Sequence, residues 1–180
     1  MRVYIAIYFD NNTKNYFNKI TSDIKKHCTG DNFTEKNNFH LTIRFIGEAD
    51  ELLITKIEEA IDKAVLNINP FELSINNLGI FKKKKTNILW IGIEENATLS
   101  ELHKKLSLSL KEGKIPFYDK LFMPHITLGR RVLFNKESVS LDNLIQFERI
   151  MIPVKAISLM ASKEINGKLS GIPIYQVNLI

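Results

Sequence analysis

The sequence contains a single cysteine and lacks any long apolar run. Because one thiol cannot form a disulfide within the chain, Cys28 excludes a disulfide-stabilised fold and fits a reducing compartment. No apolar run approaches the ~18 residues that a membrane-spanning helix needs. Residues 3–9 are apolar, but they end at Asp10 without a small-residue cleavage site, which predicts a first strand and not a signal peptide. We therefore expect a cytoplasmic protein without a membrane segment.

The composition is that of an ordinary globular protein. Of the 180 residues, 44% are hydrophobic and 25% are charged, so a disordered chain is not expected. The length suits one domain or two small, closely packed lobes. The net charge of +5 and the pI near 9.2 permit an anionic partner such as nucleic acid, although excess lysine also aids solubility. The lysine run from Lys82 to Lys85 is either a solvated hairpin tip or a loop that contacts nucleic-acid phosphates.

Strand-like and helix-like segments alternate along the chain. Apolar spacing predicts helices over residues 11–28, 51–66 and 99–110, with Asp10 or Asn11 as the first N-cap and Gly113 ending the third. Cys28, at the end of the first helix, is expected to pack against the core. A short helix is expected over residues 136–144. Strands are expected over residues 3–9, 40–46, 71–76, 88–93, 125–128, 154–161 and 174–179.

The two halves of the chain follow the same course. Val3 and His40 are 37 residues apart, as are Ile88 and His125, and each interval contains strand, helix, turn and a strand that begins with histidine. Pro70 and Pro153 each begin a strand 30 and 28 residues past those histidines. This pattern predicts an internal duplication of about 85 residues. Two repeats are too few for a solenoid, so we expect two pseudo-symmetric lobes in a single domain, residues 1–180.

Two His-x-Thr motifs carry the chemistry of the sequence. Side chains at positions i and i+2 of a strand share a face, so His40 lies beside Thr42, and His125 beside Thr127. By the same alternation Arg44 is expected on the face of His40, with Leu41, Ile43 and Phe45 opposite. Two lobes related by a two-fold axis would bring both motifs to one central cleft. That cleft would contain two imidazoles and two hydroxyls.

Such a set suits attack on a cyclic phosphodiester. With an ordinary pKa near ~6.5, one imidazole can take a proton from water while the other gives a proton to the leaving ribose oxygen. The threonine hydroxyls can donate to the non-bridging oxygens. Zinc binding is the competing use of histidine, but zinc wants three or four ligands, and only Glu48 follows either motif closely. His27 and His103 lie on expected helices without a threonine partner, so we expect them to face solvent.

The paired motifs resemble those of the 2H phosphoesterase superfamily, and most closely its bacterial and archaeal RNA 2',3'-cyclic phosphodiesterases, also called 2'-5' RNA ligases. The resemblance covers nearly the whole chain. It includes the first strand at residues 2–7, the segment NFHLTIRFIGE at 38–48, LWIG at 89–92 and PHITLGR at 124–130. One departure is Phe33, which stands where the family often has tryptophan. Phe33 could stack on a base, but a core role is favoured.

The resemblance implies a bilobal α+β fold with two antiparallel sheets flanking the cleft. It implies hydrolysis of an RNA 2',3'-cyclic phosphate to a 2'-phosphomonoester, with His40 as proton donor and His125 as proton acceptor. Thr42 and Thr127 would bind the phosphate oxygens, as would Arg130. Strict alternation puts Arg131 on the histidine face instead, so Arg130 requires a bulge near Gly129.

The implied partner is RNA ending in a 2',3'-cyclic phosphate, such as a tRNA-derived end, and a monomer without metal or other cofactor is expected. Two alternatives stay open. The same cleft could join such an end to a 5'-hydroxyl as a 2'-5' RNA ligase, or the chain could be a non-catalytic module that binds RNA ends.

Overall fold

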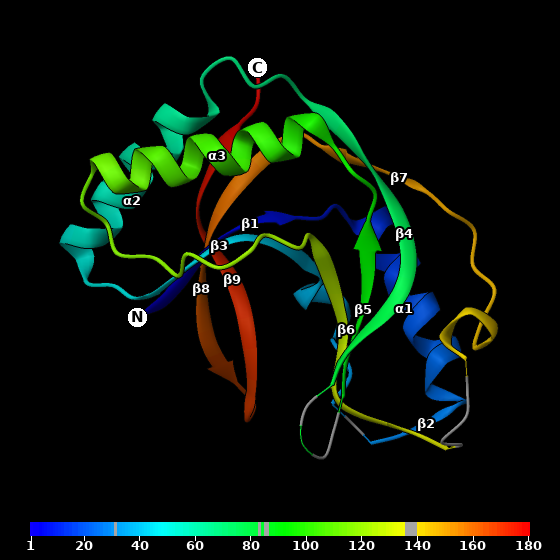
Figure 1. Cartoon of the computed structure of the whole chain (residues 1–180). Helices are drawn as coiled ribbons and strands as arrows, with labels where there is room; N and C mark the ends of the chain where they lie inside the picture. Colours follow the sequence, from blue (N-terminus) through cyan, green and yellow to red (C-terminus); the bar gives the residue numbers. More distant parts are fainter. Residues whose placement is uncertain (31, 83, 85–86, 136–139) are drawn as a thin grey trace.

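The computed structural model describes residues 1–30, 32–82, 84, 87–135 and 140–180 (Figure 1). Strands, α-helices and short 3-10 turns (η) follow one another as β1 Arg2–Tyr8, α1 Asn11–Lys25, β2 Cys28–Thr29, η1 Lys36–Asn38, β3 His40–Glu48, α2 Glu51–Val65, β4 Phe71–Lys82, β5 Asn87–Ile93, α3 Ala97–Glu112, β6 His125–Phe134, η2 Leu141–Asn143, β7 Met151–Val154, β8 Ala156–Ile165 and β9 Lys168–Asn178.

The strands form one curled antiparallel sheet in the order β7-β4-β5-β6-β3-β1-β8-β9, with β2 paired to β6 (Figure 1). The two strands that begin with histidine, β3 and β6, are neighbours at its centre. Helices α2 and α3 pack against each other, and α1 packs against η1 and β2. This arrangement confirms the mixed α+β fold with antiparallel strands. The two sheets expected from the resemblance are joined into one through the pairing of β3 with β6, and the division into two lobes stays a prediction.

The sheet order is symmetric about the junction of β3 and β6. Strands β1 and β5 begin 85 residues apart, and each pairs with a histidine strand. Strands β4 and β8 also begin 85 residues apart, but β4 pairs with β5 and β8 pairs with β1. Each side of the sheet therefore combines segments from both halves of the chain. The duplication itself stays a prediction.

The strand expected over residues 154–161 is two strands. β7 pairs with β4 at one edge of the sheet, while β8 pairs with β1 on the other side of the junction. Pro153 therefore lies inside an edge strand, where the missing N–H costs no central ladder bond, and the counterpart of the Pro70 strand is β8. Strand β9 begins at Lys168, six residues before the expected start. The sequence did not indicate this start because the first residues of the strand lack apolar alternation.

Helices α1 and α2 begin where expected, and α3 begins at Ala97, two residues before the expected start, but other details of the expectation were wrong. The Asp10 carboxylate caps α1 by accepting from the Thr13 N–H at 2.8 Å, and Gly113 ends α3. However, α1 ends at Lys25, so Cys28 lies in β2, where it still packs half-buried against the core as expected. Leu52, placed on the apolar face of α2 by its spacing, is 68% exposed. Of the expected helix at 136–144, residues 136–139 lie outside the described residues, and 141–143 form one 3-10 turn.

Two bulges in β3 change which side chains share a face. Ile5 pairs with Arg44 while Ala6 pairs with Thr42, so β3 has an extra residue there, and a second extra residue follows before Gly47. Each extra residue reverses the alternation beyond it. Arg44 consequently turns to the core side with Ile5, and Phe45 turns to the face of Tyr4, the reverse of the expected placement.

Candidate active site

The junction between β3 and β6 places both His-x-Thr motifs together. Leu41 and Ile126 form the one register pair between these strands in the part of the chain that the structure describes, and both are fully buried on the core side. The residues that flank them point to the opposite face. In an antiparallel pair this sets His40 across from Thr127, and Thr42 across from His125. The shared face expected from the sequence is therefore present.

Each imidazole is held by the backbone in the same way. The Nδ1 atom of His40 lies 2.7 Å from the carbonyl oxygen of Asn38, and Nδ1 of His125 lies 2.7 Å from that of Met123. A carbonyl oxygen can only accept, so Nδ1 carries the hydrogen in both rings. The Nε2 atoms are then left to exchange protons with a ligand. No side-chain pattern in the sequence could have shown these two carbonyl contacts.

The environment lowers the pKa of both histidines. For His40 the main cause is burial, followed by the positive charges of Arg130 and His125; for His125 the causes are burial and then Arg130. The hydrogen bonds to the two carbonyls act in the opposite direction and raise each pKa. Both rings therefore favour the neutral form. A phosphate anion between them would favour protonation of one ring.

Aromatic rings that the sequence did not single out pack against each histidine. The Tyr4 ring centroid lies 4.9 Å from that of His40, while Phe81 and Trp90 lie 5.1 and 6.0 Å from His125. Two glycines make room for them. A Cβ at Gly79 would lie 2.2 Å from the Trp90 ring, and a Cβ at Gly171 would lie 2.1 Å from the Tyr4 oxygen.

Arg130 acts on the histidines because β6 bulges where it was expected to. The register steps from Trp90–Thr127 to Leu89–Gly129, so Leu128 is an extra residue in β6, and the reversed alternation puts Arg130 on the histidine face in place of Arg131. A second step, to Asn87–Val132, leaves Arg130 and Arg131 together opposite Ile88. Arg131 has a φ of +53°, and its guanidinium lies 3.2–3.3 Å from the side-chain amide of Asn32. The charge of Arg130 is the one that lowers both histidine pKa values. This geometry favours Arg130 over Arg131 as the phosphate contact.

The other sequence expectations have mixed outcomes. His27 is exposed, as expected, and Phe33 is a core residue with 8% exposure that covers Gly129. Lys82, the last residue of β4, and Lys84 are exposed, whereas Lys83 and Lys85 lie outside the described residues.

His103, expected to face solvent, is only partly exposed. Its ring stacks on Phe122 with centroids 4.0 Å apart and planes 5° apart, and its Nε2 atom is buried without a hydrogen-bond partner among the described residues. Burial, and then the charge of Arg44, lower the pKa of His103 to about 4. The sequence could not show this, because the covering ring of Phe122 comes from a segment without regular structure.

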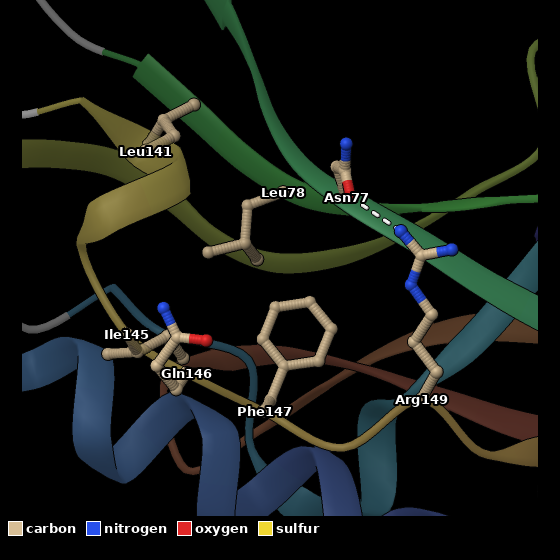
Figure 2. Close-up of a pocket in the computed structure, with 7 residues that line it drawn as sticks. All are labelled: Asn77, Leu78, Leu141, Ile145, Gln146, Phe147 and Arg149. Atoms are coloured by element: carbon tan, nitrogen blue, oxygen red, sulfur yellow. Dashed lines mark hydrogen bonds between the residues drawn. The ribbon is translucent and has the colours of Figure 1, made fainter.

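Two hollows lie away from His40 and His125. One, of about 580 Å³, is lined by Arg44, Ser100, His103, Lys104 and residues 119–122. The other, of about 280 Å³, lies between β4 and residues 141–149 (Figure 2). There Arg149 reaches across to donate to Asn77 at 3.0 Å and to Glu94 at 2.9 Å. The central cleft predicted at the histidines therefore stays a prediction.

Within the described ranges, no three His, Cys, Asp or Glu side chains are grouped closely enough to hold a metal ion. None of the helices that the structure describes combines the length and the apolar character that crossing a membrane requires.

Comparison with known proteins identifies relatives over most of the chain. Residues 15–163 match the model of the 2'-5' RNA ligase superfamily. An RNA 2',3'-cyclic phosphodiesterase of Thermotoga maritima is 30% identical over 163 residues, covering 90% of this chain and 87% of the relative. A protein of the same name from Methanothermobacter thermautotrophicus is 29% identical over 132 residues, covering 72% and 71%.

Solved structures share the fold. E. coli LigT complexed with 3'-AMP has a TM-score of 0.78 at 19% identity, covering 99% of this chain and 97% of that one. A Thermus thermophilus protein has a TM-score of 0.75 at 20% identity, covering 99% and 98%.

Proposed function

The chain belongs to the 2'-5' RNA ligase superfamily, and from this premise we propose that it hydrolyses 2',3'-cyclic phosphate ends of RNA to 2'-phosphomonoesters. The observation that carries the proposal is the matched pair of histidines on neighbouring strands, each with Nδ1 bonded to a carbonyl and Nε2 left for the substrate. A binding site alone would not need two groups prepared to carry protons.

In the proposed reaction the two rings have opposite roles. Neutral His125 accepts a proton at Nε2 from a water molecule, whose oxygen attacks phosphorus. Protonated His40 donates its Nε2 proton to the 3' oxygen as the bond between that oxygen and phosphorus breaks. The product is a 2'-phosphomonoester and a free 3'-hydroxyl. The rings exchange protonation states, so solvent must return them before the next turnover.

The remaining residues stabilise the phosphate. Thr42 lies across from His125, and Thr127 lies across from His40, so the two hydroxyls can donate to the two non-bridging oxygens. Arg130, whose positive charge already acts on both rings, offsets the negative charge that grows on those oxygens. The antiparallel crossing of β3 and β6 allows the rings to approach phosphorus from opposite sides, as in-line displacement requires.

Product analysis tests this function directly. The protein would be incubated with 2',3'-cyclic AMP, and the products separated and identified by ³¹P NMR. The expected product is 2'-AMP, and the rate should be unchanged by EDTA because no step uses a metal. Unchanged substrate, or 3'-AMP as the product, would refute the proposal. Activity that is lost in EDTA and restored by zinc would instead support a metal site.

Ligation belongs to the same site. The same displacement can use the 5'-hydroxyl of another RNA end in place of water: that oxygen attacks phosphorus, the 3' oxygen leaves with the proton from His40, and a 2'-5' phosphodiester forms. Because water is far more concentrated than any RNA end, hydrolysis dominates. We further propose that the substrate is RNA, such as a tRNA-derived end, and that the chain acts as one monomeric domain. A cytoplasmic location stays a prediction that rests on the single cysteine.

A further inference from the structure

Tyr118 is an exposed aromatic side chain on a rigid backbone. The residue is 55% exposed, and its ring meets that of Phe45 edge to face with centroids 5.1 Å apart. Its backbone N–H donates to the Phe45 carbonyl at 3.0 Å, and its own carbonyl accepts from the buried Arg44 guanidinium at 3.4 Å. A ring fixed in this way loses little freedom when a flat ligand stacks on it.

A row of rings connects this position with the candidate active site. The bulges in β3 turn Phe45 to the histidine face, where it pairs directly with Tyr4, and Tyr4 packs against His40. The segment that begins at Tyr118 also ends at the site, since the carbonyl of Met123 holds His125. Tyr118 therefore lies at the margin of the face that carries both catalytic motifs.

The charges around Tyr118 favour an anion. The guanidinium of Arg2, an exposed residue, lies 4.7 Å from the centroid of the Phe45 ring. Lys120 is exposed two residues beyond Tyr118. Two acids lie nearby, and both are paired: Asp119 with Arg44 at 3.3 Å and Lys111 at 3.4 Å, and Glu48 with the N-terminal ammonium at 3.4 Å. Exposed aromatic rings beside cations are how proteins hold single-stranded nucleic acid.

We propose that Arg2, Phe45 and Tyr118, here called the Tyr118 patch, bind the nucleotides that precede the cyclic phosphate in an RNA strand. A base stacks on the exposed Tyr118 ring, and Arg2 contacts a phosphate of the strand. The inference rests on the proposed function and extends it, because it makes an oligonucleotide, and not a cyclic mononucleotide, the preferred substrate.

The test compares two substrates in Tyr118→Ala: 2',3'-cyclic AMP and a short oligoadenylate that ends in a 2',3'-cyclic phosphate. We expect kcat/KM for the oligonucleotide to fall about 5- to 150-fold, the loss expected for one stacked base. With cyclic AMP, kcat/KM should stay at the wild-type value. Tyr118→Trp should keep the preference for the oligonucleotide, and Leu52→Ala, which removes an exposed side chain from α2, should change neither substrate.

Equal loss on both substrates, or no loss on either, would overturn the Tyr118 patch. Fluorescence anisotropy with a labelled oligoadenylate that ends in a 3'-hydroxyl measures RNA binding without hydrolysis. It therefore tests the Tyr118 patch independently of the proposed function. If the wild type leaves cyclic phosphates intact, Tyr118→Ala must still weaken this binding. Unchanged affinity in Tyr118→Ala would reject the patch whatever the enzyme activity.

Discussion

At the scale of single residues, the site depends on what each imidazole touches. Fixing Nδ1 of His40 and His125 on carbonyl oxygens sets which nitrogen exchanges protons. Burial and the charge of Arg130 then hold both pKa values below the ordinary histidine value. Because kcat/KM reports ionisations of the free enzyme, its pH optimum should lie below the ordinary histidine pKa of ~6.5.

Arg130 gives a prediction with a definite sign. Its positive charge disfavours a second positive charge on either ring, so Arg130→Gln removes a cause that lowers both pKa values. The pH profile of kcat/KM should move to higher pH, together with a fall in its maximum from the lost phosphate contact. Arg131→Gln is the control, since that guanidinium faces Asn32. An unmoved profile in Arg130→Gln, or an equal movement in Arg131→Gln, would contradict this role.

Gly79 and Gly171 are predicted to be required for the rings beside the histidines. An alanine Cβ at Gly79 would overlap the rigid Trp90 indole. Overpacking of this kind should destabilise Gly79→Ala by about 1–3 kcal/mol in urea unfolding and lower its rate by displacing the support of His125. The same substitution in a Trp90→Phe background should cost less, because the smaller ring leaves space. Equal costs in the two backgrounds would show that the overlap is not the cause.

At the scale of elements, sequence periodicity predicted correctly which side chains share a face wherever a strand is regular. The motifs at His40 and His125 share a face because two-residue alternation holds over their first three positions. The placement of Arg44 and Phe45 failed because a bulge depends on the register of the neighbouring strand β1, which no local pattern encodes. The exchange of β4 and β8 across the junction was missed for a similar reason, since strand partners are chosen by tertiary packing.

The stack of His103 on Phe122 joins α3 to the segment before His125, and it should make stability depend on pH. The folded state holds the pKa of His103 at about 4, whereas the unfolded chain binds the proton near ~6.5. Stability is therefore full above ~6.5 and is lost as the pH falls toward 4. Between pH 7 and 5 this residue should account for about 1–2 kcal/mol.

Urea unfolding at pH 7 and pH 5 measures this effect. In His103→Gln the decrease in unfolding free energy between the two pH values should be smaller than in the wild type. His27→Gln, which changes an exposed histidine, should behave as the wild type. If His103→Gln keeps the full decrease, the proton is taken up elsewhere.

At the scale of the whole molecule, the sheet has a narrow centre and a continuous core. The described parts of β3 and β6 share one register pair, Leu41 with Ile126, yet one apolar cluster extends from Val3 through Leu89 to Leu179. Each side of the sheet contains strands from both halves of the chain. Unfolding of the strands on one side of the sheet should therefore disrupt the other side.

This continuity predicts one cooperative unfolding transition. Trp90, the single tryptophan, reports on β5 by fluorescence, and a Trp90→Phe/Tyr175→Trp variant would report on β9 at the other side of the sheet. For each protein, unfolding followed by fluorescence and unfolding followed by far-UV circular dichroism should give the same urea midpoint. Separate midpoints would show that the two sides unfold independently.

The central claim is that His40 and His125 act together on one phosphorus atom. The most direct measurement is the rate of 2'-AMP formation from 2',3'-cyclic AMP by the wild type, His40→Ala and His125→Ala, with circular dichroism to confirm that each variant is folded. We predict that each substitution alone lowers kcat by about 10²- to 10⁴-fold. A folded variant of either histidine that turns over at the wild-type rate would contradict the account.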